Sequence, residues 1–258
     1  MSTQPDWQFA SSNEPERGGR IKRLAGFGIM LAVLALLVVA GAPLARMYLD
    51  VPSMSAFRIF LYAVQFGLVL TGLGLLLTVI AVYLRAASAW KRGLIMAVLG
   101  LLPLASILVT LGPDRFASPM IHDVTTDTDD PPEFDKAREL RSAGENSLDY
   151  GGAEIAEQQQ AAWPELGPVI TDKTPDLAFQ RAIETVMELD WHLVNADFDT
   201  GIIEAYDTTR LFGFVDDVVI RVRPHESGSR VDIRSVSRIG LGDAGKNAAR
   251  IREFIRTY

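Results

Sequence analysis

Three long runs of apolar residues lie within the first 111 positions of the chain. The first run, Leu24 to Ala45, is uncharged for 22 residues, which is long enough for a helix to cross a hydrocarbon layer of about 30 Å. The other two runs are Ile59–Leu84 and Gly93–Leu111. A cleavable signal peptide is the alternative interpretation of the first run, but its apolar core would be unusually long. We therefore expect three transmembrane helices within residues 21–112.

A pattern with a period of two follows in the last fifth of the chain. In residues 217–223, and again in residues 230–234, apolar side chains alternate with charged ones, as in strands that bury one face. Turn-forming residues separate the two segments, so together they predict an antiparallel hairpin. Two registers remain open, because either Arg221 or Arg223 can lie opposite Asp232 and pair with it.

Further elements surround this hairpin. Thr174-Pro175-Asp176 is typical of a helix start, and the strand-like segments Trp191–Phe198 and Ile202–Thr209 come next. After the hairpin, Asp243 is expected to cap a helix that runs to Tyr258. The order helix, four strands, helix predicts an α+β domain at residues 172–258. We expect a two-layer sandwich, with a four-stranded antiparallel sheet and two helices on one of its faces.

Charge divides the chain into two parts. Residues 1–113 carry a net charge of +5 and residues 114–258 carry −12, and the chain has no cysteine. Most of the acidic excess lies in residues 113–171, which predict an extended acidic linker. Residues 1–20 are polar and rich in proline and glycine, so we expect a disordered tail. The acidic group of Asp123, Asp127, Asp129 and Asp130 with His122 could bind a hard cation, but it lacks the glycine and the final glutamate of a calcium loop. We therefore predict no metal site.

Basic residues that flank the apolar runs predict their orientation. Arg17, Arg20, Lys22 and Arg23 precede the first run, and Arg85, Lys91 and Arg92 lie between the second and the third. The positive-inside rule then places the N-terminal tail in the cytoplasm and the C-terminal domain outside it. For a bacterial inner membrane this outside is the periplasm. In the second run, Ala63, Gly67 and Thr71 recur every four residues and favour close helix packing, including self-association with a second copy.

The C-terminal domain resembles a known family. DDVVIR at Asp216–Arg221 and DIRSVSRIGLGDAGKNAARI at Asp232–Ile251 resemble the family called domain of unknown function 1499. The likeness extends upstream through Gly201–Ala205 and Trp191 to TTDTDDPP at Thr125–Pro132. Lys246 departs from the pattern, which favours a small apolar residue there. The resemblance implies an envelope-associated domain and supplies no catalytic residues, substrate or cofactor.

Candidate chemistry lies mainly on the polar side of the predicted strands. If both helices cover the other face, this side is open and its arginines can bind phosphate or carboxylate groups in a bidentate manner. A ladder of ion pairs on a solvated face is the alternative. The acidic linker could also dock on this face. The residues of this face that we expect to contribute are Glu204, Asp217, Arg221, Asp232, Arg234 and Arg238.

A second candidate is the glycine-rich turn before the last helix. Helix N-termini can hold anions, although Asp243 places its own carboxylate there. Asn247 and Arg250 follow one turn later and could brace this turn. Catalytic patterns are weak: Ser235 and Ser237 have no histidine beside them in the sequence, and the adjacent Asp216 and Asp217 point to opposite faces of a strand.

These patterns together predict a multi-pass membrane protein that displays a non-catalytic domain outside the cytoplasm. The domain is expected to bind an anionic small molecule, a lipid or an envelope protein, without a cofactor and without nucleic acid. Two other classes remain open at this point. One is an envelope enzyme that uses the Asp/Arg face, and the other is a structural subunit of a membrane complex.

Overall fold

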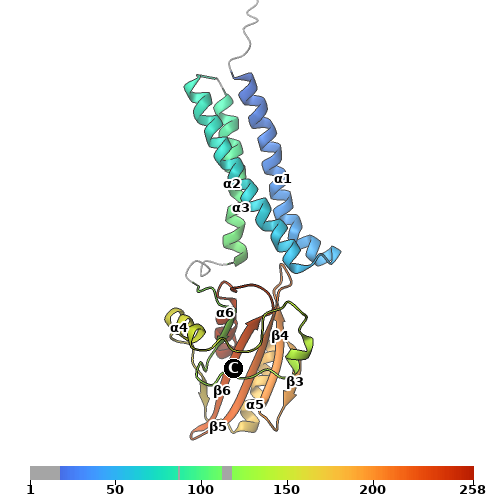
Figure 1. Ribbon diagram of the computed structural model, residues 1–258, viewed down its shortest axis with the longest axis vertical. Coiled ribbons are helices and arrows are strands. Elements are labelled where there is room, and N and C mark those ends of the chain that lie inside the picture. Colours follow the sequence, from blue (N-terminus) through green and yellow to red (C-terminus); the bar gives the residue numbers. More distant parts are fainter. Residues whose placement is uncertain (1–17, 87, 112–117) are drawn as a thin grey trace, which may run out of the picture. The chain divides into compact units, whose positions relative to one another are not determined.

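The computed structural model describes residues 18–86, 88–111 and 118–258. The predicted disordered tail therefore lies almost entirely outside the described residues, as does the start of the predicted linker. The chain divides into two compact units, one of residues 1–45 and 55–107 and the other of residues 46–54 and 108–258 (Figure 1).

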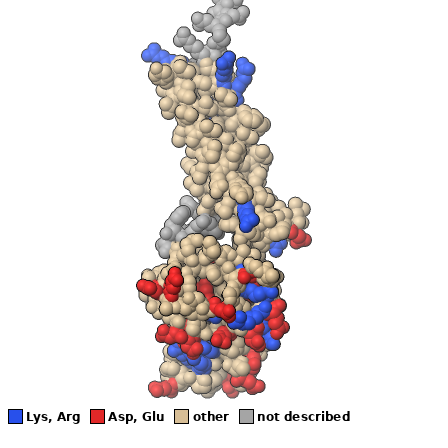
Figure 2. Space-filling model, in the orientation of Figure 1, with Lys and Arg blue, Asp and Glu red and all other residues tan. Residues whose placement is uncertain are grey.

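The first unit contains three helices, α1 (Gly19–Leu49), α2 (Ser53–Tyr83) and α3 (Ala89–Leu111). All three are long and apolar enough to cross a membrane, which confirms the three predicted helices. Figure 2 shows a largely uncharged surface on this unit, with lysine and arginine gathered near the helix ends. Each helix begins several residues before the predicted apolar run.

Small residues bring α2 and α3 into close contact. A side chain at Gly67 would place its Cβ 2.6 Å from the carbonyl oxygen of Gly100. The hydroxyl of Thr71 donates a hydrogen bond of 3.2 Å to the carbonyl of Ala97. The predicted stripe of Ala63, Gly67 and Thr71 therefore packs against a helix of the same chain at two of its three positions, and self-association with a second copy stays a prediction.

The second unit is built around a sheet in which every pairing is antiparallel, with the strand order β1-β6-β5-β4-β3 and with β2 also paired to β6. Its strands are β1 (Asp123–Thr125), β2 (Val169–Thr171), β3 (His192–Asp197), β4 (Ile202–Thr208), β5 (Val215–His225) and β6 (Gly228–Ser237). Its helices are the 3-10 helix η2 (Lys136–Leu140) and the α-helices α4 (Ala153–Ala162), α5 (Pro175–Glu188) and α6 (Lys246–Thr257). The sheet has six strands where four were predicted, because the acidic segment supplies β1 and β2. The antiparallel sheet with helices is confirmed.

The central hairpin adopts the first of the two registers. Val222 lies opposite Val231, and Arg221 lies opposite Asp232. This register brings Val218, Ile220 and Val222 of β5 to the same face as Val231 and Ile233 of β6.

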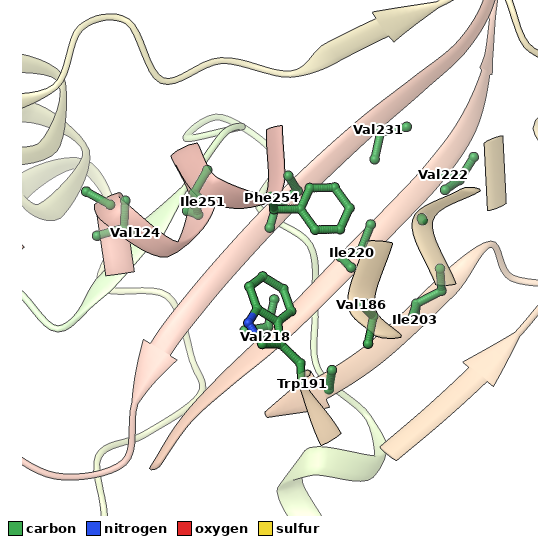
Figure 3. Close-up of a cluster of buried hydrophobic side chains, with 14 of the residues drawn as sticks. Val124, Val186, Trp191, Ile203, Val218, Ile220, Val222, Val231, Ile251 and Phe254 are labelled. Atoms are coloured by element: carbon green, nitrogen blue, oxygen red, sulfur yellow. The ribbon is translucent and has the colours of Figure 1, made fainter. Parts of the chain in front are cut away.

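That apolar face packs against α5 and α6. The buried side chains shown in Figure 3 include Ile203, Ile220 and Val231 from the sheet, with Val186 from α5 and Phe254 from α6. The rings of Trp191 and Phe254 stack with their centroids 5.9 Å apart. The prediction of two helices on one face is consistent with this core.

The opposite face is covered as well, by residues 127–150 of the acidic segment. Phe134, Ala137 and Leu148 bury Val219 and Val236 in a second apolar cluster on this side of the sheet. The prediction of an extended linker is therefore wrong for the described part of residues 113–171, since this segment forms two strands and an additional layer of the domain. Its acidic composition concealed these roles.

Helix α4 closes the edge of the sheet beside β1. The buried side-chain amide of Gln159 donates a 2.6 Å hydrogen bond to the carbonyl of Thr125 and accepts a 2.9 Å hydrogen bond from its N–H. A single side chain thus satisfies the backbone groups that a neighbouring strand would otherwise bind.

Candidate functional site

The polar face of the sheet has the predicted composition but not the predicted exposure. Glu204, Asp217 and Asp232 are all fully buried, and Arg234 is almost fully buried. The prediction that this face is open to solvent is therefore wrong at these positions. Residues 127–150 lie over the face and supply partners for the charged side chains. We refer to residues 127–150 as the strap.

Glu204 binds the backbone of the strap. Its Oε1 accepts hydrogen bonds from the N–H groups of Asp135 (2.8 Å) and Ala137 (3.1 Å), and its Oε2 accepts one from Lys136 (2.8 Å). These N–H groups lie at the start of η2, where a helix has no internal acceptors for them. Glu204 is therefore a capping residue supplied from the sheet, and it has no free oxygen for a ligand.

Asp217 is held by two arginines. Its carboxylate lies 2.7 Å from Nε of Arg141, which belongs to the strap, and 2.7 Å from Nη2 of Arg238 on the sheet side. The guanidinium of Arg238 also lies over the ring of Tyr206, 5.6 Å from its centroid. Arg238, a predicted ligand residue, is thus engaged within the domain.

The guanidinium of Arg234 is enclosed by other residues of the domain. Asp123 binds it in a bidentate manner, with distances of 2.9 Å and 2.7 Å, and the carbonyls of Pro132 and Leu148 accept its other N–H groups. The rings of Phe134 and Tyr150 each lie 5.3 Å from the guanidinium carbon, and burial raises the pKa of Tyr150 to about 12. Arg234 therefore has a structural role and no access to an external anion.

Three arginines gather at the end of the sheet near the β5–β6 turn. Arg221, Arg223 and Arg230, which we call the hairpin cluster, all bind Asp127 Oδ2, at 3.4 Å, 3.2 Å and 2.6 Å respectively. They also all bind Asp232, at distances of 2.9 to 3.4 Å. Two carboxylates that are almost completely buried are therefore shared by three guanidiniums, which leaves one positive charge over.

Asp130 neutralises this remaining charge from the outside. Its Oδ2 lies 2.7 Å from Nη1 of Arg223 and 3.2 Å from Nη2 of Arg221, while its side chain is 64% exposed. The hydrogen bond from Arg223, together with the nearby charge of Arg221, lowers the pKa of Asp130 below its usual value. Asp130 is thus an ionised carboxylate held on the solvent side of a basic cluster.

Sequence reasoning found Arg221 and Asp232 but missed the rest of this cluster. Arg223 and Arg230 are direct cross-strand partners in the observed register, and like charges in such positions repel each other. This repulsion was the signal in the sequence for the rest of the cluster, because two opposed arginines require a carboxylate from elsewhere in the chain. Asp127 supplies it from within the TTDTDDPP motif.

A family model described as protein of unknown function DUF1499 matches residues 123–257. The chain belongs to the DUF1499 family. The match begins at the first residue of β1 and ends with α6, so it covers the whole sheet domain with its strap. No curated protein matches the sequence.

The helix side of the DUF1499 domain contains the other predicted residues. Asp243 accepts hydrogen bonds from the N–H groups of Gly245 (2.8 Å) and Asn247 (2.6 Å), and burial raises the pKa of its carboxyl group. Arg250 is buried between Asp207 and Asp216, 2.7 Å from each. Asp243 therefore caps the turn before α6, and Arg250 ties α6 to the sheet.

Asn247 connects the same helix to β6. Its Oδ1 accepts a hydrogen bond from the hydroxyl of Ser235 (2.7 Å), and its Nδ2 donates one to the hydroxyl of Ser237 (2.9 Å). Both serines of the weak hydrolase pattern are thus engaged with an asparagine. Asn247 is fully buried and braces the turn instead of facing a ligand.

Metal and acid–base chemistry receive no support from the positions of the carboxylates. In the part of the chain that the structure describes, no group of three or more His, Cys, Asp or Glu residues could hold a metal ion. Asp123 and Asp127 face arginines, and Asp216 and Asp217 lie on opposite faces of β5, paired with Arg250 and Arg238. The hairpin cluster is therefore the arrangement best suited to an external anion.

Proposed function

We propose that this protein is a multi-pass protein of a bacterial inner membrane whose DUF1499 domain is displayed in the periplasm and binds an anionic group without catalysis. The binding position is the hairpin cluster, at the place that Asp130 occupies. The group bound there is a phosphate or a carboxylate, carried by a small molecule, a lipid or an envelope protein.

The charge balance of the hairpin cluster carries this proposal. Asp127 and Asp232 fix the three guanidiniums in place, so that little ordering is required when an anion binds. Only the exposed Asp130 completes neutralisation of the cluster. Guanidinium groups bind phosphate and carboxylate in the same planar geometry, so an external anion can replace the Asp130 carboxylate.

The distribution of basic residues supports the orientation. Arg20, Lys22 and Arg23 lie at the start of α1, and Lys91 and Arg92 lie at the start of α3, which follows the α2–α3 connection. By the positive-inside rule these ends face the cytoplasm, and the sheet domain that follows α3 then lies on the other side.

The test is calorimetric titration of the full-length protein in a nonionic detergent with inorganic phosphate. Asp130→Asn removes the competing carboxylate, and we expect it to raise phosphate affinity about tenfold, which corresponds to about 1.4 kcal/mol. Arg223→Gln should abolish binding. The control is Glu226→Gln, which removes an exposed carboxylate from the β5–β6 turn. Equal affinities for Asp130→Asn and Glu226→Gln would refute the proposed site.

A further inference from the structure

Three connections meet at the end of the sheet opposite the β5–β6 turn. They are residues 118–122 before β1, residues 209–214 between β4 and β5, and residues 238–245 between β6 and α6. Backbone hydrogen bonds join them to one another or to the adjacent strand ends: Arg238 N–H donates to Val215 O (3.0 Å) and Asp243 N–H donates to Ile121 O (3.1 Å). We call these three connections the loop end.

The loop end carries large apolar side chains that are exposed. Leu241 is 79% exposed and Met120 is 72% exposed, and Leu211 and Ile239 are also exposed. A Cβ added at Gly242 would lie 3.1 Å from the Cα of Met120, so the loop of Leu241 runs directly beside Met120. Leu241 and Met120 therefore form an exposed apolar patch on two adjoining loops, and such patches mark contact surfaces more often than residues scattered singly do.

The covalent chain limits what can cover this patch. Helix α3 ends at Leu111, and Met120 follows only nine residues later. Nine residues span at most about 30 Å even when fully extended. The patch is therefore tethered within that distance of the end of an apolar helix that is long enough to cross a membrane. A lipid surface around this helix is within reach of the patch.

The charges at the loop end also favour a lipid surface. Arg210, in the second connection, and Lys246, at the start of α6, are both exposed. Basic side chains beside exposed leucine and methionine are typical of segments that enter the headgroup region of an anionic bilayer. In contrast, the β5–β6 turn at the other end of the sheet has Glu226, Ser227 and other polar residues exposed.

We propose that the loop end is a membrane-contact surface, in which Leu241 and Met120 enter the interfacial region of the bilayer in which the protein is anchored. Contact at these two residues restrains the domain at its tethered end. The hairpin cluster, at the opposite end of the sheet, stays accessible from solution. This inference does not depend on the anion-binding proposal.

Site-directed spin labelling can test this contact, because the chain has no cysteine. Leu241→Cys and Met120→Cys are labelled separately in the full-length protein and reconstituted into vesicles that contain phosphatidylglycerol. Ser227→Cys, in the exposed β5–β6 turn, is the matched control. Collisions of each label with oxygen, which partitions into lipid, are compared with collisions with a water-soluble nickel chelate.

The expected result is an oxygen-to-nickel collision ratio at positions 241 and 120 that is at least threefold higher than at position 227. Transfer of the protein to detergent-free nanodiscs of the same lipid should preserve this contrast. Equal ratios at the three positions would overturn the proposal. A raised ratio at position 241 alone would also overturn it, because the patch requires both residues to enter the lipid together.

Discussion

Replacement of Glu204 by glutamine directly tests whether the strap is an integral layer of the domain. The two oxygens of Glu204 accept three hydrogen bonds from the N–H groups of Asp135, Lys136 and Ala137. Glutamine has the same size, but its amide nitrogen cannot accept a hydrogen bond. If its oxygen replaces Oε1, its nitrogen faces the N–H of Lys136, and one buried donor is left without an acceptor.

The size of the effect follows from these contacts. A hydrogen bond to a charged group contributes about 1.5–3 kcal/mol, and the substitution removes one such bond and weakens the other two. We therefore expect the attachment of η2 to lose about 2–4 kcal/mol. Since about 1.4 kcal/mol is a factor of ten in an equilibrium constant, the locally open state becomes about 30- to 700-fold more populated.

Hydrogen exchange followed by mass spectrometry on the full-length protein measures this change directly. In the native state, amides of the strap exchange through local opening, so those of residues 135–137 should exchange faster by the same factor. The control is Glu139→Gln, which removes an exposed carboxylate from the same 3-10 helix. If exchange at residues 135–137 is the same in Glu204→Gln and Glu139→Gln, the capping role of Glu204 is refuted.

Two further substitutions test the packing of each unit. Arg234→Lys keeps the charge but loses the planar group between two rings and at least one of its hydrogen bonds. It should therefore lower the free energy of unfolding by about 2–3 kcal/mol. An unchanged midpoint of urea unfolding, monitored by tryptophan fluorescence, would contradict this. Gly74→Leu should lower the thermal unfolding temperature in detergent, because a Cβ there would lie 2.6 Å from the backbone nitrogen of Ala97. Gly72→Leu is its control, since a Cβ at Gly72 meets nothing within 4 Å, and equal losses in both variants would argue against close packing of α2 and α3.

Periodic patterns predicted the elements that repeat over many residues. The apolar runs predicted α1, α2 and α3, and the alternation in residues 217–223 predicted which side chains share each face of the sheet. These predictions succeeded because hydrophobic burial acts on every second residue of a strand and on every residue of a lipid-facing helix.

Docking of the acidic segment on the polar face was left open, but its strands and its role as a layer of the domain were missed because its attachments are not periodic. Strands β1 and β2 have only three residues each, too few to show alternation. The most important contact of η2 is made by its backbone N–H groups, which look the same in any sequence. The acidic composition then favoured a solvated linker, although the carboxylate of Asp123 meets the buried Arg234 and that of Asp127 meets the half-buried Arg230.

The register of the hairpin nevertheless contained a clue to the covered face. A solvated face with alternating ion pairs would place acids opposite bases, whereas Arg223 lies opposite Arg230 in the register observed. Two guanidiniums in this position, with Arg221 beside them, repel each other unless a carboxylate from another segment lies between them. Asp232 alone cannot neutralise three arginines, so the hairpin requires a second acid, and Asp127 provides it. Two like charges directly opposite each other on neighbouring strands are thus evidence that another part of the chain covers that face. Here this evidence distinguishes a docked acidic strap from a free linker.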